Sequence, residues 1–200
     1  MKQQLDLNEA YAVVTPADSA IEVLTLSDLQ AQCRLDSVDE AELVKQHLAA
    51  AIDKLQRDTL LELRPTRLAL KLDRFPCGAR PIELNRCPVV GNVEITYFDT
   101  EGDEQSLIED DDFYTDATSR PGRLSPVSGT SWPATERRPH AVTIEFDCGF
   151  DEGAVPATAL QALRLLVGHW FVNREAAIDR RITEIAIAYG DLVQLLQWKA

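Results

Sequence analysis

The apolar residues of this chain change their spacing twice, and these changes limit the folds that it can adopt. In "SVDEAELVKQHLAAAIDKLQ" they recur every three or four residues, as on the buried face of a helix, for example at Val44, Leu48 and Leu55. From Pro65 they alternate with polar residues, as in a strand with one buried face, and helical spacing returns at Pro156. The sequence therefore predicts an α+β fold with an antiparallel β insertion between the second and third helices.

Four helices are expected to form most of the core, which makes the predicted core mainly helical. The first is short and begins after Thr25, which can cap it, with Asp28 in its first turn. Pro65 is expected to force the end of the second helix, and the third begins at Pro156, whose missing N–H suits a first helical turn. The segment "ITEIAIAYG" fits either a strand or a helix, and "DLVQLLQWK" fits a short last helix. The third helix is predicted to fill the core with Leu163, Leu166, Val167, Trp170 and Phe171.

The middle of the chain is predicted to be short strands joined by long loops. Two-residue alternation marks strands in "RLALKLD", "PIEL", "NVEITYFD" and "AVTIEFDCGF", whereas "DTEGDEQ" and "SRPGRLSPVSGTSWP" are rich in turn residues. We expect helices within residues 23–64 and 155–198 and the β insertion within 65–150, in a single domain spanning 23–200, because no linker divides it. Residues 1–22 show no periodicity and are predicted to be a flexible N-terminal arm, or one that a partner orders.

The charge of the chain excludes some classes of partner. Its 20 Lys and Arg against 33 Asp and Glu give a net charge of −13, which opposes sequence-independent binding to nucleic-acid phosphates. No apolar run approaches the roughly 20 residues that span a bilayer, and the N-terminus lacks a signal-peptide pattern, so we expect a cytoplasmic protein without a membrane contact. The four cysteines are widely spaced and are predicted to be free thiols.

No residue pattern in the chain indicates catalysis, and we predict no catalytic, cofactor-binding or metal-binding site. His169 and Glu175 are six residues apart on one helix, so they face different sides and cannot act as a pair. The acidic run "EDDDFYTD" lacks the alternating ligands and the glycine of a calcium loop, so a small metal-dependent hydrolase is the least favoured function. The run is better explained as a solvated acidic surface formed by Glu109, Asp110, Asp111 and Asp112.

Six segments occur in a recognisable order: "LTLSDLQAQCRLD", "DEAELVKQHLAAAIDKLQ", "PIELNRCPVVGNVEITYFDTEGDEQSL", "PGRLSPVSGTSWP", "RRPHAVTIEFDCGF" and "VPATALQALRLLVGHWFVNREA". In this order they resemble the head-tail connector proteins of tailed bacteriophages and prophages, also called head-completion or adaptor proteins. The resemblance spans about residues 23–176. The chain departs from it at "RDTLLELRP", where the family commonly has an aromatic-Thr-Gly-Arg turn, and at its end, "EIAIAYGDLVQLLQWKA".

The resemblance implies a structural assembly protein and not an enzyme. Such proteins form a ring, usually twelvefold, that docks under the portal after DNA packaging, extends the DNA channel and offers a surface to tail-joining proteins. The implied partners are further copies of the chain, the portal protein and a downstream tail-joining protein, with DNA passing through without sequence-specific binding. The implied location is the virion neck, after synthesis and assembly in the host cytoplasm. The alternative is another phage neck or tail-completion protein.

A ring uses heterologous contacts, in which one face of a subunit meets a different face of the next subunit. The acidic segment from Asp99 to Asp116 can oppose basic side chains of a neighbouring subunit. A second basic group follows the third helix, whose exposed end is predicted to dock. The predicted subunit or portal interface comprises Arg120, Arg123, Arg137, Arg138, Arg174, Glu175, Arg180 and Arg181.

Overall fold

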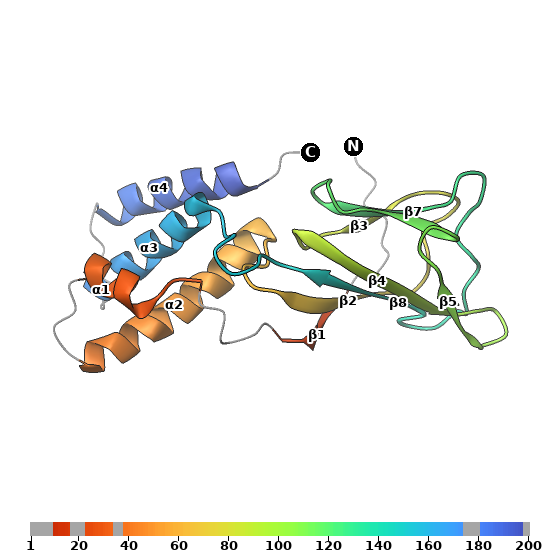
Figure 1. Cartoon of the computed structure of the whole chain (residues 1–200), viewed down its shortest axis with the longest axis horizontal. Coiled ribbons are helices and arrows are strands. Elements are labelled where there is room, and N and C mark those ends of the chain that lie inside the picture. Colours follow the sequence, from red (N-terminus) through yellow and green to blue (C-terminus); the bar gives the residue numbers. More distant parts are fainter. Residues whose placement is uncertain (1–9, 17–22, 34–37, 174–180, 198–200) are drawn as a thin grey trace. The chain divides into compact units, whose positions relative to one another are not determined.

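The computed structural model describes residues 10–16, 23–33, 38–173 and 181–197. The chain divides into two compact units (Figure 1): a helical unit, Ser19–Arg64 with Phe150–Ala200, and a strand-rich unit, Met1–Asp18 with Pro65–Gly149. The described residues form four helices and two antiparallel sheets, which confirms the α+β class. The prediction of a mainly helical core is wrong, because the strands bury a hydrophobic core of their own.

The described part of the helical unit consists of α1 (Leu26–Cys33), α2 (Val38–Thr59), α3 (Ala157–Val172) and α4 (Arg181–Leu196). Thr25 caps α1 as predicted: its hydroxyl accepts the N–H of Asp28 at 3.2 Å and donates to the Asp28 carboxylate at 2.7 Å. α2 ends several residues before Pro65, where Leu60 takes a left-handed φ of 60°.

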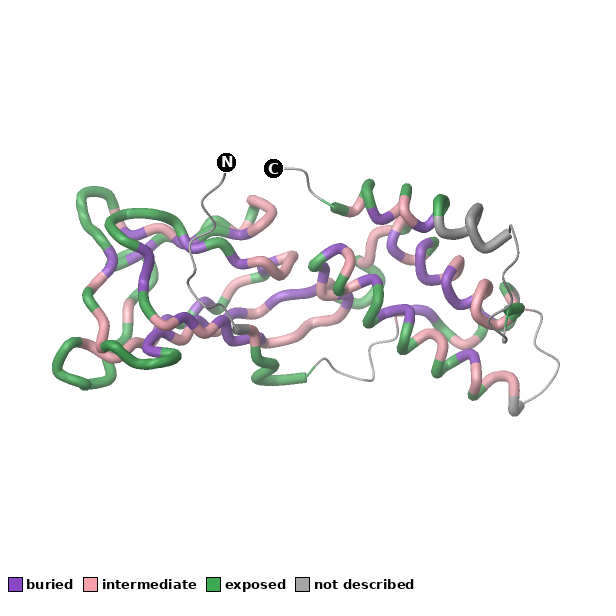
Figure 2. Tube along the Cα trace, turned by 180° about the vertical axis from the view of Figure 1, so that it is seen from behind, coloured by how far each residue is buried: buried purple, intermediate pink, exposed green. Residues whose placement is uncertain are grey.

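The helical unit buries one face of each long helix (Figure 2). Val44 of α2 and Leu163 and Val167 of α3 are completely buried, and contacts connect α3 with both α2 and α4. α4 includes the segment whose pattern fitted either a strand or a helix. It is helical, and Tyr189 and Val193, four residues apart, are buried on one side of it. No described helix combines the length and the apolar character that crossing a membrane requires.

A polar cluster joins α4 to the end of α2. The Asp58 carboxylate accepts a hydrogen bond from the Tyr189 hydroxyl at 2.8 Å and forms an ion pair with Lys54 at 2.9 Å. Gln197 donates to the Asp58 backbone oxygen at 2.6 Å. Burial raises the pKa of the Asp58 carboxyl, but the hydrogen bonds from Lys54 and Tyr189 outweigh burial and hold that pKa below its usual range. Burial and the bond to Asp58 raise the pKa of Tyr189.

Two antiparallel sheets form the described part of the strand-rich unit. Their orders are β1-β2-β8-β4-β5 and β3-β7-β6. The strands are β1 (Ala10–Thr15), β2 (Thr66–Leu72), β3 (Ile82–Leu84), β4 (Val89–Phe98), β5 (Glu104–Leu107), β6 (Phe113–Asp116), β7 (Gly122–Pro126) and β8 (Val142–Cys148). The two-residue alternation correctly indicated β2, β3, β4 and β8.

Three further strands lie where the sequence indicated turns and an acidic loop. β5 is exposed along most of its length and β6 buries only Phe113, so neither has an alternating apolar pattern. β7 does alternate, but two of its buried positions are Gly122 and Pro126, which look like turn residues. A Cβ at position 122 would lie 2.8 Å from the Val89 side chain, so this strand position needs a glycine.

β1 lies within the segment that the sequence indicated as a flexible arm. It pairs antiparallel with β2, with Tyr11 opposite Leu70. The Tyr11 ring packs against the core of the strand-rich unit, and its hydroxyl accepts the N–H of Asn85 at 2.8 Å. Pairing with the edge of β2, which sequence periodicity does not reveal, therefore orders these residues.

The two sheets pack their inner faces against each other. Phe113 of β6 and Phe146 of β8 are completely buried, and Leu70, Leu84 and Ile144 lie in the same cluster. Side chains from both sheets thus form one core, as in a sandwich of two sheets.

On the outer face of the five-stranded sheet, one arginine binds three carboxylates. Arg67 of β2 lies 2.9 Å from Glu94 and 3.1 Å from both Glu145 and Asp147. Glu94 and Glu145 are directly opposite each other in register, so their charges would repel without the arginine. Burial lowers the pKa of Arg67, but its hydrogen bonds to Asp147 and Glu145 outweigh burial, and the net effect raises this pKa.

We expect Arg67→Met to destabilise the protein by about 2 kcal/mol at neutral pH, because it leaves three carboxylates together without a counter-charge. The loss should shrink in acid, where protonated carboxyls no longer repel each other. Urea unfolding followed by circular dichroism, once at neutral pH and once in acid, measures this loss of stability. Arg123→Met is the matched control: Arg123 lies 4.0 Å from Glu83 in a half-exposed pair, so this loss should stay within about 0.5 kcal/mol. Equal losses would refute the role given to Arg67.

We expect Tyr189→Phe to weaken the attachment of α4 by about 1 kcal/mol at neutral pH, because it removes a hydrogen bond to an ionised carboxylate. A carboxyl whose pKa is lowered in the folded state stabilises that state above its unfolded pKa. That stabilisation is lost as the pH falls through the folded pKa, so the difference should shrink below about pH 4. Hydrogen exchange of the α4 amides, compared between the variant and the natural protein, measures this difference. The control is Tyr114→Phe, at an exposed tyrosine of β6, and a faster exchange of α4 in this control would count against the assignment.

Candidate functional site

The pairing of β2 with β8 forces two loops of the strand-rich unit together. Leu72, the last residue of β2, is opposite Val142, the first residue of β8. The segment after β2 therefore meets the segment before β8. Two hydrogen bonds fix this contact: the His140 N–H donates to the Asp73 carboxylate at 2.9 Å, and the Trp132 N–H donates to the Gly78 oxygen at 3.3 Å.

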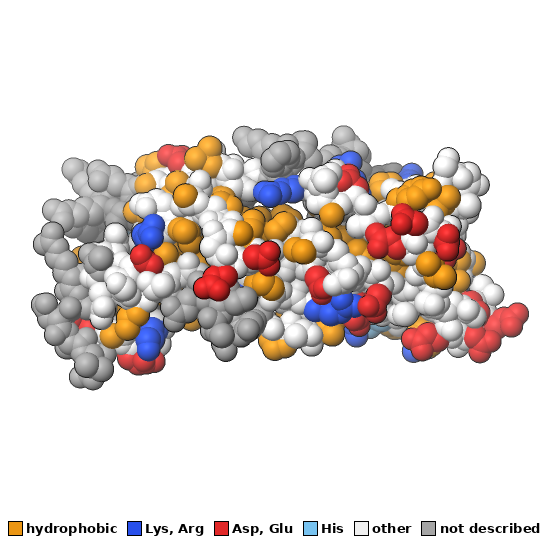
Figure 3. Space-filling view, in the orientation of Figure 1, with side chains coloured by type: hydrophobic (Ala, Val, Ile, Leu, Met, Phe, Trp, Pro, Cys, Tyr) orange, Lys and Arg blue, Asp and Glu red, His pale blue; other side chains and the backbone are white. Residues whose placement is uncertain are grey.

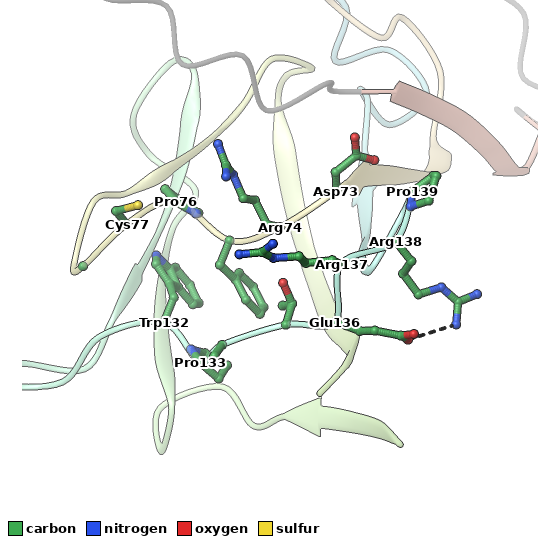
Figure 4. Close-up of a pocket in the computed structure, with 14 residues that line it drawn as sticks. Asp73, Arg74, Pro76, Cys77, Trp132, Pro133, Glu136, Arg137, Arg138 and Pro139 are labelled. Atoms are coloured by element: carbon green, nitrogen blue, oxygen red, sulfur yellow. Dashed lines mark ion pairs between the residues drawn. The ribbon is translucent and has the colours of Figure 1, made fainter. Parts of the chain in front are cut away.

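Between these loops lies an open pocket of about 700 Å³, lined by residues 73–78 and 132–139 (Figure 4). Its floor is aromatic. The rings of Phe75 and Trp132 are stacked with centroids 5.1 Å apart, and Tyr97 meets Phe75 edge-on at 5.5 Å. The indole N–H of Trp132 donates to the Arg80 oxygen at 2.8 Å, which fixes the ring. The floor is thus apolar and held in place.

Three arginines line this pocket, and they differ in whether their guanidinium groups are already paired. In Figure 4 Arg138 points away from the others towards Glu136, with 3.6 Å between their charged atoms, and its guanidinium lies 4.1 Å from the centroid of the Phe98 ring. Arg74 and Arg137 come from the two opposing loops and are exposed. Within the described ranges, neither has an ion pair or a hydrogen bond to another side chain. These two guanidinium groups are therefore available to an anionic ligand.

The acidic run folds into a compact turn between β5 and β6, which we call the acidic turn (residues 108–113). The Asp112 carboxylate accepts the N–H of Ile108 at 2.8 Å, and the Asp112 N–H donates to the Ile108 oxygen at 2.8 Å. The Asp110 N–H donates to the Phe113 oxygen, also at 2.8 Å. These bonds leave the carboxylates of Glu109, Asp110 and Asp111 exposed on a fixed backbone.

Other carboxylates of the acidic segment shape its backbone. Asp99 accepts hydrogen bonds from the Gln105 side chain and from the N–H groups of Glu101 and Asp103, and these bonds lower its pKa. Asp116 accepts bonds from Ser119 and Thr118, which lower its pKa well below the usual range. Acidic side chains gather over β4 and β5 on the face shown in Figure 3. The segment is therefore a set of ordered turns as well as a charged surface.

The structure separates the residues of the predicted interface. Arg137 and Arg138 line the pocket, whereas Arg123 pairs with Glu83 across β7 and β3, and Arg120 precedes β7. Residues 174–180, which include Arg174, Glu175 and Arg180, lie outside the described residues, as does the side chain of Arg181. Of the residues predicted for the core, Leu163, Leu166 and Val167 are buried, whereas Trp170 and Phe171 are half-buried.

Sequence reasoning missed Arg74, Phe75 and Trp132 as pocket residues. Trp132 lies about 60 residues along the chain from Arg74 and Phe75, and the two loops that carry them both contain proline. The strand patterns of residues 67–73 and 141–150 were visible, and pairing these two strands antiparallel would have brought their flanking loops together. The missing information was which strands pair.

The pocket can bind an anionic segment, with two arginines for its charge and an aromatic and proline floor for apolar side chains. The groups needed for metal chemistry are not gathered anywhere in the described ranges, where no three His, Cys, Asp or Glu side chains could hold a metal ion. The four cysteines are free thiols, and only Cys77, on the pocket wall, is exposed.

No family model matches the chain, and no curated protein matches it. Chains of solved structures do match it. A chain in the virion of the native gene transfer agent (GTA) particle is 19% identical, with a TM-score of 0.75, and the match covers 95% of this chain and 96% of that one. A chain in the neck of the empty GTA particle, computed with C6 symmetry, is 20% identical with a TM-score of 0.75, covering 96% of both chains. A chain in the neck of the native GTA particle, computed with C12 symmetry, is 19% identical with a TM-score of 0.72, again covering 96% of both. This protein therefore shares the fold of chains found in GTA particles over nearly its whole length.

Proposed function

We propose that this protein is a structural component of the neck of a phage-like particle. The observation that carries the proposal is the end-to-end fold match, since both the helical and the strand-rich unit are included in the 95–96% that is covered. An isolated shared unit would be weaker support, because common folds serve many functions. The sequence resemblance to head-tail connectors points to the same class of protein.

Within the neck, the role that fits best is that of a head-tail connector. Copies of the chain form a ring under the portal, extend the DNA channel and offer a docking surface to tail-joining proteins. The similar chains occur in necks computed with C12 and C6 symmetry, which supports a ring of identical subunits and favours twelve copies. The role is structural and not catalytic. The location is the virion neck, after assembly in the host cytoplasm.

A ring of connector subunits should form on the portal. We expect the purified protein, mixed with portal particles from the same virus or prophage, to add twelve copies per portal, as counted by mass photometry and by electron microscopy. Parallel incubation with the tail proteins encoded nearby tests the alternative, a neck or tail-completion protein of another layer. Binding to tail proteins without binding to the portal would replace the connector role with that alternative.

The net charge of −13 suits a passage for DNA. An acidic wall does not retain phosphates, so we expect the lumen of the assembled ring to carry more Asp and Glu than Lys and Arg. A reconstruction of the ring on its portal measures this distribution. A lumen lined mainly by Lys and Arg would be the contrary result.

A further inference from the structure

We infer that the arginine pocket between the two loops receives the acidic turn of a second copy of this chain. The inference rests on the proposed ring, because a closed ring of identical subunits needs two different surfaces that fit each other. The strand-rich unit carries both surfaces. The pocket presents Arg74 and Arg137, and the turn presents Glu109, Asp110 and Asp111.

Charge is the first reason for pairing these two surfaces. Two copies that each carry a charge of −13 repel each other, so a contact that sets a basic site of one copy against an acidic surface of the other is favoured. Arg138 is already engaged by Glu136 and Phe98, whereas Arg74 and Arg137 have no partner among the described side chains. Guanidinium groups bind carboxylates with two parallel hydrogen bonds, so the acidic turn is a suitable ligand for this pair.

The apolar parts also match. Ile108, at the start of the acidic turn, has 60% of its surface exposed, so its side chain is accessible to a partner. The pocket offers it the small exposed parts of the Phe75 and Trp132 rings, which are 5% and 7% exposed, and the half-buried Pro133. An isoleucine on this floor would exclude water from the surrounding ion pairs and strengthen them.

Both surfaces hold their shape before they meet. Backbone hydrogen bonds fix the acidic turn, and the bonds of His140 and Trp132 fix the two pocket loops. Little backbone conformational entropy is then lost on association, which favours a specific contact between small surfaces.

Cross-linking through Cys77 tests the contact directly, because this exposed thiol lies on the pocket wall. In the full-length Asp111→Cys variant, a short bismaleimide should link Cys77 of one copy to the new thiol of the next. Head-to-tail contacts should give a ladder of covalent dimers, trimers and larger species, with the link mapped by peptide mass spectrometry. Adding Cys77→Ser should abolish the ladder. Glu152→Cys, at an exposed acid of the helical unit, is the matched control and should give none.

Charge reversal supplies an independent measurement. Arg137→Glu, introduced into the Asp111→Cys protein, should lower the cross-linking yield at least about tenfold, because like charges then face each other. In the protein with its natural cysteines, Arg137→Glu and Asp111→Arg should each weaken self-association in sedimentation velocity. Mixing these two variants should restore it, since in an alternating ring each reversed pocket meets a reversed turn and each natural pocket meets a natural turn.

The results separate this inference from the proposed function. Rings that assemble on the portal without any link to Cys77, or with a link only inside one chain, would overturn the inference and leave the connector role intact. A Cys77 link with no ring on the portal would support the contact and remove the connector role. Duplex DNA that competes with the link at low salt would show that the pocket binds phosphates, and would also overturn the inference.

Discussion

The antiparallel pairing of β2 with β8 is the interaction on which most of the strand-rich unit depends. It aligns Leu68, Leu70 and Leu72 with the buried side chains of β8 and so builds much of the core of this unit. On the opposite face it sets Arg67 beside Asp147 and Glu145. At the end of the pair it brings together the loops that form the pocket. A shift of one residue would exchange the two faces and disrupt all three arrangements at once.

The excess of acidic residues has three separable physical roles. Glu94, Glu145 and Asp147 surround one arginine in the sheet, and Asp99 and Asp116 hold turns by accepting hydrogen bonds from the backbone and nearby side chains. Other carboxylates, such as those at the tip of the acidic turn, remain exposed. Carboxylates that are already engaged within the chain are less available to a partner, so the net charge overstates how much acidic surface is free for binding.

Periodicity predicted the parts of the fold in which each element buries its own alternating face. It found β2 and β8 because Leu70 and Phe146 sit among regularly spaced apolar residues, and the cap at Thr25 follows from local chemistry. It missed β1 and β5, which are ordered by pairing with a neighbouring strand. It also missed a helix end at Leu60, where a left-handed backbone and not Pro65 stops α2. Pairing and backbone strain are set by distant contacts, which local sequence spacing does not encode.

The candidate site also depends on distant contacts that local sequence spacing does not reveal. Arg137 and Arg138 attracted notice as adjacent charges, but the structure divides them: Arg138 is paired within its own loop, and Arg137 is open to a ligand together with Arg74 from the other loop. The fold match leaves this chemistry undetermined, because at 19–20% identity about four in five aligned residues differ. Pairing of β2 with β8 keeps the two loops adjacent whatever side chains they carry. The choice of partner therefore depends on the residues of this chain's own two pocket loops. The shared fold only brings these two loops close together.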